Sequence, residues 1–136
     1  MRPKSFGEAD SLACDEPICD AARGLLDGHI ILSRSLAAAG HYPAIDILNS
    51  VSRLSTALVA SAGRQRIAKV REALAGYSRA EDLISLGAHV RGANPKLDAS
   101  IDAHDAIVQF LRQDVAQLSP LVETEAGLES VAALLP

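Results

Sequence analysis

The chain has 136 residues, 49% of them hydrophobic and 22% charged, which is typical of a globular domain with its own core and excludes an intrinsically disordered chain. The formal net charge of −4 argues against a general nucleic-acid-binding protein. The apolar runs are short and interrupted by charges, which predicts no transmembrane helix, and residues 1–10 lack the apolar stretch of a signal peptide.

The first part of the chain predicts a helix and then a strand. Residues 1–14 are polar and mixed, so we expect them to be frayed. Asp15-Glu16-Pro17 predicts a helix start, with acidic residues before proline, and the helix runs to about Leu26 before Gly28 ends it. Residues 29–33 form the one convincing strand. Because this run is too apolar for a surface edge, it predicts a buried sheet that this chain alone does not complete.

A structured loop follows the strand. A small-residue helical piece over residues 34–39 is ended by Gly40, and an apolar loop comes next. Pro43 fixes its own φ and biases Tyr42 toward an extended backbone, which orients the ring for stacking. Arg53 closes the loop, where an arginine suits a planar or anionic partner.

Two other interpretations of these side chains stay open. Tyr42 fits equally a ring at the edge of the core, with no ligand. Arg53 fits a residue that caps a helix or pairs with Asp46. The residues alone do not separate these structural roles from binding.

From Asn49 onward the pattern becomes helical. Gly63 separates two short helices, and the second, over residues 64–76, is amphipathic. Its polar side favours a solvated outer face over a binding patch. Ser78-Arg79-Ala80-Glu81 has the spacing of a capping box and predicts a new helix that ends near Gly92. The cations of the amphipathic helix are Arg64, Arg66, Lys69 and Arg71.

The last third of the chain predicts a long helix and a short one. Asn94-Pro95 gives the start signal, and an apolar seam with spacings of three and four follows. We interpret His104, on this seam, as a hydrogen-bonded histidine at the core edge. Ser119-Pro120 breaks the pattern before a final helix over residues 124–135. The seam consists of Leu97, Ile101, His104, Val108, Leu111, Val115 and Leu118.

Residues 27–53, DGHIILSRSLAAAGHYPAIDILNSVSR, resemble the corresponding stretch of the flagellar and type III secretion protein-export ATPases, relatives of the rotary ATP synthase catalytic subunits. Residues 71–101 resemble the helical C-terminal region of that family, and residues 15–18 resemble its opening. The likeness covers about residues 15–118. His29 and His41 favour the export branch, and residues 92–95, GANP, lean toward the flagellar side.

The resemblance implies a mainly α fold, in which the end of a RecA-like α/β nucleotide-binding core with one short strand precedes a C-terminal helical bundle. The resemblance divides the chain into a frayed N-terminus over residues 1–14, the end of the ATPase core over residues 15–60, and a helical domain over residues 61–136. It also implies a C-terminal part of an ATPase that couples ATP hydrolysis to the export of protein substrates.

The resemblance carries roles to two residues. Tyr42 falls where the family places an aromatic ring against adenine. Arg53 falls where it places an arginine finger, which reaches the neighbouring subunit's site in a hexameric ring and stabilises charge on the γ-phosphoryl group. The complete enzyme uses ATP and Mg²⁺. Its expected partners are like subunits, the export apparatus, substrates and chaperones, in the cytoplasm and peripherally at the inner membrane, with no nucleic acid.

The departures from the family pattern limit what this chain can do alone. The phosphate-binding motif G-x-x-x-x-G-K-[ST] does not occur in the sequence, and no strand that ends in a metal-binding aspartate can be placed before Asp27. We therefore expect the chain alone to bind no nucleotide tightly and to hydrolyse no ATP. His89 stands where the family usually has tyrosine.

Two alternatives come from other classes of protein. The chain fits a stand-alone helical interaction module without nucleotide binding, whose apolar seam packs against a partner helix. A zinc site at Cys14, Cys19 and His29 is the less favoured reading of a C-x4-C spacing, because no second cysteine pair completes it. Two thiols without a metal are the simpler interpretation.

Overall fold

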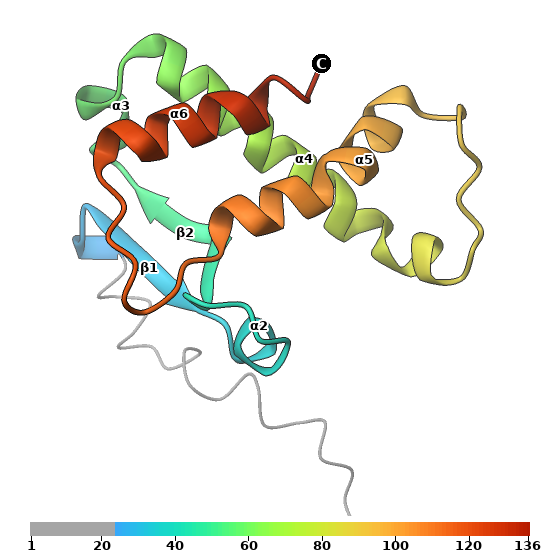
Figure 1. Cartoon of the computed structure of the whole chain (residues 1–136), viewed down its shortest axis with the longest axis horizontal. Helices are drawn as coiled ribbons and strands as arrows, with labels where there is room; N and C mark the ends of the chain where they lie inside the picture. The colour runs from blue at the N-terminus through green and yellow to red at the C-terminus, as the bar shows by residue number, and fades with distance from the viewer. Residues whose placement is uncertain (1–23) are drawn as a thin grey trace, which may run out of the picture.

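The computed structural model describes residues 24–136 and combines a two-stranded sheet with helices (Figure 1). The predicted mainly α fold class is confirmed. The predictions for the frayed N-terminus, the helix start at Asp15 and the two cysteines lie outside the described residues. In chain order the elements are β1 (Gly28–Leu32), α2 (Arg34–Ala38), β2 (Ile45–Ser52), α3 (Ser55–Leu58), α4 (Ser61–Ser85), α5 (Pro95–Leu111) and α6 (Leu121–Ala132).

The sheet is an antiparallel pair in which Gly28 of β1 stands opposite Ser52 of β2. A Cβ on Gly28 would lie 2.8 Å from the backbone oxygen of Val51, so glycine permits the close approach of the strands here. On β1, Ile30 and Leu32 share one face, and each is 71% exposed. The described residues therefore leave this apolar face uncovered.

The prediction of a single strand, with helix from Asn49 onward, was wrong. The chain stays extended through Ser52 and pairs with β1. Ile45, Ile47 and Val51 fall on alternate positions, which is the period of a strand, although Asn49 interrupts the series. Cross-strand hydrogen bonding therefore prevails over the weak helical pattern.

α4 is one helix of 25 residues, so the predicted break at Ser78 was wrong, and the break predicted at Gly63 lies at residues 59–60, between α3 and α4. The buried positions Val70, Ala73 and Ala80 lie three and seven residues apart, on one face that continues past the capping-box sequence. Tertiary packing of this face outweighs the local signal at Ser78. The helix ends before Gly87, whose φ of +66° stops it earlier than expected.

α5 begins where the sequence predicts, because the Asn94 side chain accepts a hydrogen bond from the Leu97 amide at 3.3 Å and proline follows in the first turn. It ends at Leu111, however, so the predicted seam stops there. Val115 and Leu118 lie in the next loop and are almost fully exposed. The start of α6 at Leu121 is three residues earlier than the predicted 124.

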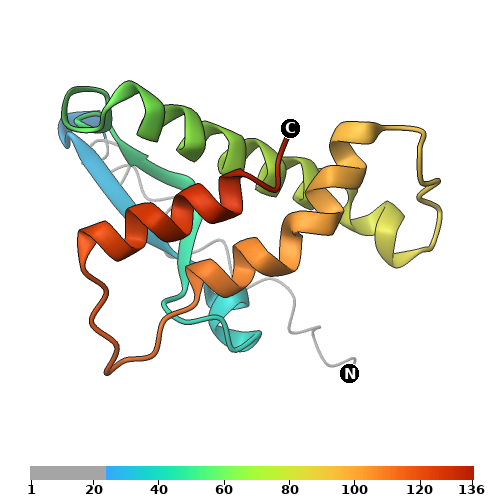
Figure 2. The same cartoon turned by 45° about the horizontal axis from the view of Figure 1, so that its top comes forward.

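The core lies where α4, α5 and α6 meet, as Figures 1 and 2 show from two sides. Ile107 of α5 is fully buried, and Phe110 packs against the same cluster. The α4–α5 connection projects away from the sheet (Figure 2). None of the helices in residues 24–136 has the length and apolar character needed to cross a bilayer. The buried members of the core are Val70, Ala73, Ala103, Ile107, Val131, Ala132 and Leu135.

Candidate functional site

The two side chains selected from the sequence lie beyond opposite ends of β2. Tyr42 precedes the strand by three positions, and Arg53 follows its last residue directly. The flanking helices α2 and α3 mark these two ends in Figure 1. The ends of β2, Ile45 and Ser52, stand opposite Leu32 and Gly28 of β1, four residues apart, so at about 3.3 Å per residue they are separated by about 13 Å. The fold keeps Tyr42 and Arg53 apart.

The loop that carries Tyr42 is held from two sides. Gly40 has a φ of +69°, which lets the chain turn after α2, and the His41 amide donates to the Leu36 carbonyl at 2.9 Å. The Gln113 amide, just beyond α5, donates to the Tyr42 carbonyl at 2.9 Å. The Tyr42–Pro43 peptide bond is cis. The backbone is thus fixed while the Tyr42 side chain stays 55% exposed.

The buried neighbour of Tyr42 is a titratable group. His41 is one of two buried polar residues in the described part of the chain. Burial disfavours the charged imidazolium, and the positive charge of Arg112 acts in the same direction, so the pKa of His41 lies below its ordinary value. We expect a neutral imidazole here at pH 7.

Acidification should therefore destabilise the fold through His41. Between its lowered folded-state pKa and an unfolded pKa of about 6.5, the unfolded chain binds more protons, so the free energy of unfolding falls as pH drops through this window. His41→Gln should remove this component. Urea midpoints of both proteins at pH 8 and pH 5.5 measure it, and equal pH dependence in the two proteins would contradict the assignment.

Arg53 is held through its backbone and presents its side chain outward. Its amide donates to the Asp27 carbonyl at 2.8 Å, and the Thr56 hydroxyl donates to its carbonyl at 3.2 Å. The Arg53 side chain is exposed and makes no ion pair with the other residues described. The carboxylate of Asp46, the alternative partner, instead accepts from the amide and the side chain of Asn49, at 3.0 and 2.8 Å.

The prediction of a solvated outer face on α4 holds for Arg64 and Lys69, which are exposed, whereas Arg66 and Arg71 are half-buried. Arg64 donates to the carbonyls of Thr56 and Val59, and Arg66 pairs with Glu129 of α6 at 2.8 Å. The remaining two cations donate to backbone oxygens of β2 and of the C-terminal segment. The amphipathic pattern predicted a helix over residues 64–76, which lie within α4. Nothing in the sequence indicated these intramolecular contacts. The residues in question are Arg64, Arg66, Lys69 and Arg71.

His104 lies at the core edge, as predicted, in a cleft of about 520 Å³ between β2 and the helices α4 and α5. Its ring stacks on Tyr77, with centroids 3.6 Å apart and planes 13° from parallel, a contact that the sequence did not indicate. Its Nδ1 lies 3.5 Å from a carboxylate oxygen of Asp105. His89, the departure from the family pattern, has its Nε2 2.8 Å from Asp98.

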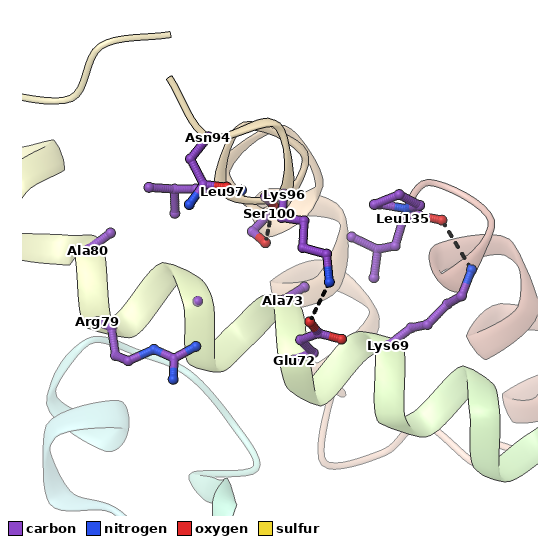
Figure 3. Close-up of a pocket in the computed structure, with 12 residues that line it drawn as sticks. Lys69, Glu72, Ala73, Arg79, Ala80, Asn94, Lys96, Leu97, Ser100 and Leu135 are labelled. Atoms are coloured by element: carbon purple, nitrogen blue, oxygen red, sulfur yellow. Dashed lines mark hydrogen bonds and ion pairs between the residues drawn. The ribbon is translucent and has the colours of Figure 1, made fainter. Parts of the chain in front are cut away.

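A second cleft, of about 560 Å³, lies between α4, the start of α5 and the C-terminus (Figure 3). Lys96 reaches Glu72 at 3.3 Å, and Lys69 donates to the Leu135 carbonyl at 3.4 Å, as the dashed lines of Figure 3 mark. Its lining contains neither Tyr42 nor Arg53. This cleft therefore plays no part in the candidate site.

The chemistry of the exposed pair fits a nucleotide. A flat phenol ring stacks on a purine, and a guanidinium contacts two phosphate oxygens at once. The described residues contain no group of three or more His, Cys, Asp or Glu side chains that could hold a metal ion. The zinc alternative remains untested, because Cys14 and Cys19 lie outside residues 24–136.

Two family models match the chain. The T3SS EscN ATPase C-terminal domain matches residues 59–130, which include α4, α5 and most of α6. The nucleotide-binding domain of the ATP synthase alpha/beta family matches residues 8–52, which include both strands. The two models thus divide the chain between the sheet and the helices.

Curated relatives of this chain are type 3 secretion system ATPases and flagellum-specific ATP synthases. The chain is 43% identical over 129 residues to the type 3 secretion system ATPase of Pseudomonas syringae pv. tomato, and 42% identical over 120 residues to the flagellum-specific ATP synthase of Treponema pallidum. The alignments cover 95% and 88% of this chain but only 28% and 27% of those proteins. The chain therefore spans just over a quarter of the length of these relatives.

Solved structures share the fold. The assembled ATPase EscN of the enteropathogenic E. coli type III secretion system matches with a TM-score of 0.83 at 36% identity, over 87% of this chain and 29% of that one. EscN in complex with its central stalk EscO matches with a TM-score of 0.81 at 36% identity, over 86% of this chain and 29% of that one.

Proposed function

The chain belongs to the family of flagellar and type III secretion protein-export ATPases, of which it represents the C-terminal portion, and from this premise we propose that it supplies two side chains to ATP hydrolysis in a ring of like subunits. Tyr42 stacks on the adenine bound by its own subunit. Arg53 is an arginine finger that serves the site of the neighbouring subunit.

The separation of the two side chains along β2 carries this proposal. The loop of Tyr42 precedes β2 and the turn of Arg53 follows it, at strand ends that stand opposite Leu32 and Gly28 of β1, about 13 Å apart. Both side chains are exposed, so each is available to a partner outside the described residues. From opposite ends of the strand, Tyr42 can contact the ATP of its own subunit while Arg53 contacts that of a neighbour, and a ring of like subunits provides both.

Each side chain suits its proposed task. The Tyr42 phenol offers a flat apolar face at a fixed position, because hydrogen bonds on both sides of the loop hold its backbone. The Arg53 guanidinium is always protonated and presents a planar set of donors to the phosphate oxygens. Its positive charge stabilises the negative charge on the transferring phosphoryl group, which is the role of an arginine finger.

The sequence contains no phosphate-binding loop, so the groups that cradle the phosphates and Mg²⁺ come from outside these 136 residues. When bound, Mg²⁺ neutralises charge on the β- and γ-phosphates. The chain alone therefore hydrolyses no ATP. The complete enzyme couples hydrolysis to the export of protein substrates, in the cytoplasm at the inner-membrane export apparatus.

The partners follow from the same proposal. A structural relative is described as an assembled ATPase, and another as a complex with its central stalk, which supports a ring of like subunits around a partner for this chain. The alternative, a stand-alone interaction module, requires the apolar seam of α5 to pack against a helix of a partner protein. In the structure α5 packs on α4 and α6 mainly through Ala103 and Ile107, and of the predicted seam only Leu111 joins this core.

The adenine contact can be tested in a chimera of the Pseudomonas syringae ATPase, in which this chain replaces the segment that it matches. Stacking of one base on an aromatic ring contributes about 1–3 kcal/mol, so Tyr42→Ala should raise the KM for ATP about tenfold while kcat changes less than about twofold. Tyr42→Phe, which keeps the ring, should behave like the unmodified chimera.

Steady-state ATPase assays measure both constants. The isolated chain serves as the control for background turnover and should show none with Mg²⁺ and ATP. Mg²⁺-dependent turnover by the isolated chain, or an unchanged KM in Tyr42→Ala, would contradict the proposed division of parts.

A further inference from the structure

The strand that precedes Arg53 contains an irregular stretch. Cross-strand pairs are present at Asp46 and Val51, but the register shifts between them, so residues 47–50 are left out of the pairing with β1. A bulge of this kind bends its strand and changes the direction of the side chains near it. The direction of Arg53 therefore depends on what fixes residues 47–50.

α4 supplies the hydrogen bonds that the sheet does not. Arg71 donates from Nη2 to the Leu48 carbonyl at 3.0 Å and from Nη1 to the Ser50 carbonyl at 3.4 Å. One planar guanidinium thus holds two carbonyls that are two residues apart in the chain. From β1, the Ile31 amide donates to the Ser50 hydroxyl at 3.0 Å. The bulge is fixed from α4 and from β1.

We propose that Arg71 is a positioning residue for Arg53: it links the helical part of the chain to the strand that presents the finger. The proposal rests on the proposed role of Arg53. Arg71 is half-buried, and its two acceptors lie three and five residues before Arg53. Arg71 touches neither nucleotide nor reacting atoms in this arrangement and acts only through the strand.

The expected size of the effect follows from geometry. Without the guanidinium, two half-buried carbonyls lose their donors and the bulge can relax. A shift of about 1 Å in a catalytic group costs up to about 100-fold in rate. Lysine keeps the charge but offers a single point of contact, so Arg71→Lys should restore only part of the loss.

The test is a double-mutant cycle in the chimera of the Pseudomonas syringae ATPase. Arg71→Ala should lower kcat about 10- to 100-fold while the KM for ATP changes less than about threefold. In an Arg53→Ala background, the same substitution should change kcat less than about twofold, because the group that it positions is gone. Arg66→Gln, which breaks the pair between α4 and α6, is the matched control and should leave kcat within about twofold.

Amide hydrogen exchange on the isolated chain separates positioning from unfolding. Arg71→Ala should accelerate exchange of the Arg53 amide, which is bonded to the Asp27 carbonyl, while amides around Ile107 stay protected. Loss of protection at Ile107 as well would show general unfolding, and Arg71→Lys must then reproduce the selective effect for the inference to survive.

The kinetic outcomes are distinct. If Arg53→Ala leaves kcat unchanged, the proposed function itself fails. If Arg53→Ala lowers kcat but the effect of Arg71→Ala multiplies with it, the proposed function stands and the positioning role is overturned.

Discussion

Arg53→Ala should lower kcat for ATP hydrolysis by about 1,000-fold in the chimera with the Pseudomonas syringae ATPase, at the lower end of the effect of an arginine finger. The KM for ATP should change less than about threefold, because the guanidinium contacts charge that develops in the transition state. The Arg53 side chain is exposed, so the free energy of unfolding should change by less than about 0.5 kcal/mol. Steady-state kinetics and urea unfolding measure the two quantities.

Mixed rings test whether Arg53 acts on the neighbour. Chimeras with Arg53→Ala are combined with chimeras whose phosphate-binding loop is disabled, each inactive alone. If the finger works across the subunit boundary, some boundaries in the mixed ring carry an intact loop on one side and an intact Arg53 on the other, and activity returns. Absence of recovery in rings that demonstrably contain both chimeras would place Arg53 in its own subunit's site. Arg53→Lys, which keeps the charge without the planar fork, should recover only part of kcat.

Ile107→Ala should be the most destabilising of these substitutions, at about 2–5 kcal/mol of unfolding free energy. Ile107 is fully buried at the junction of α4, α5 and α6, so its removal leaves a cavity that three helices surround. Urea unfolding of the isolated chain measures the loss, with the slope checked for a change in the surface exposed on unfolding.

Leu118→Ala is the matched control, because the sequence predicts Leu118 to be a packed apolar residue of the same helix. In the structure Leu118 is 92% exposed in the loop after α5. Its replacement should change the unfolding free energy by less than about 0.5 kcal/mol. Comparable losses at both positions would mean that the helix continues to Leu118 and packs there.

Local sequence signals were sufficient to predict the ends of helices that depend on neighbouring residues alone. Asn94 and Pro95 give the start of α5, because a side-chain oxygen caps the Leu97 amide and proline needs no acceptor for its nitrogen. Gly40 ends α2 for the equally local reason that its φ is positive. Such features depend on residues within one turn of each other, which a sequence displays directly.

Tertiary contacts decided the elements that the sequence missed. The extension of β2 depends on pairing with β1, and the continuity of α4 past Ser78 depends on packing of Val70, Ala73 and Ala80. The end of α5 depends on the Gln113 amide, which bonds to the Tyr42 carbonyl 71 positions earlier in the chain. Short-range patterns contain no record of such partners.

The candidate site divides in the same way. Tyr42 and Arg53 could be selected from the sequence through the family resemblance, and the structure leaves both side chains exposed. Their roles in catalysis remain predictions. Arg71 could not be selected, because its carbonyl acceptors on β2 are 21 and 23 residues away. Every residue has a backbone carbonyl, so the residue types do not mark these acceptors.

The position of β2 between Tyr42 and Arg53 has a mechanical consequence. Both ends of β2 pair with β1 and its bulge is bonded to Arg71 of α4, so the loop before Ile45 and the turn after Ser52 belong to one hydrogen-bonded unit. In a ring built as proposed, binding of adenine to one subunit would displace β2, whose other end contacts the triphosphate in the next subunit's site. These eight residues would then be enough to set the order in which adjacent sites hydrolyse ATP, without rotation of a whole domain.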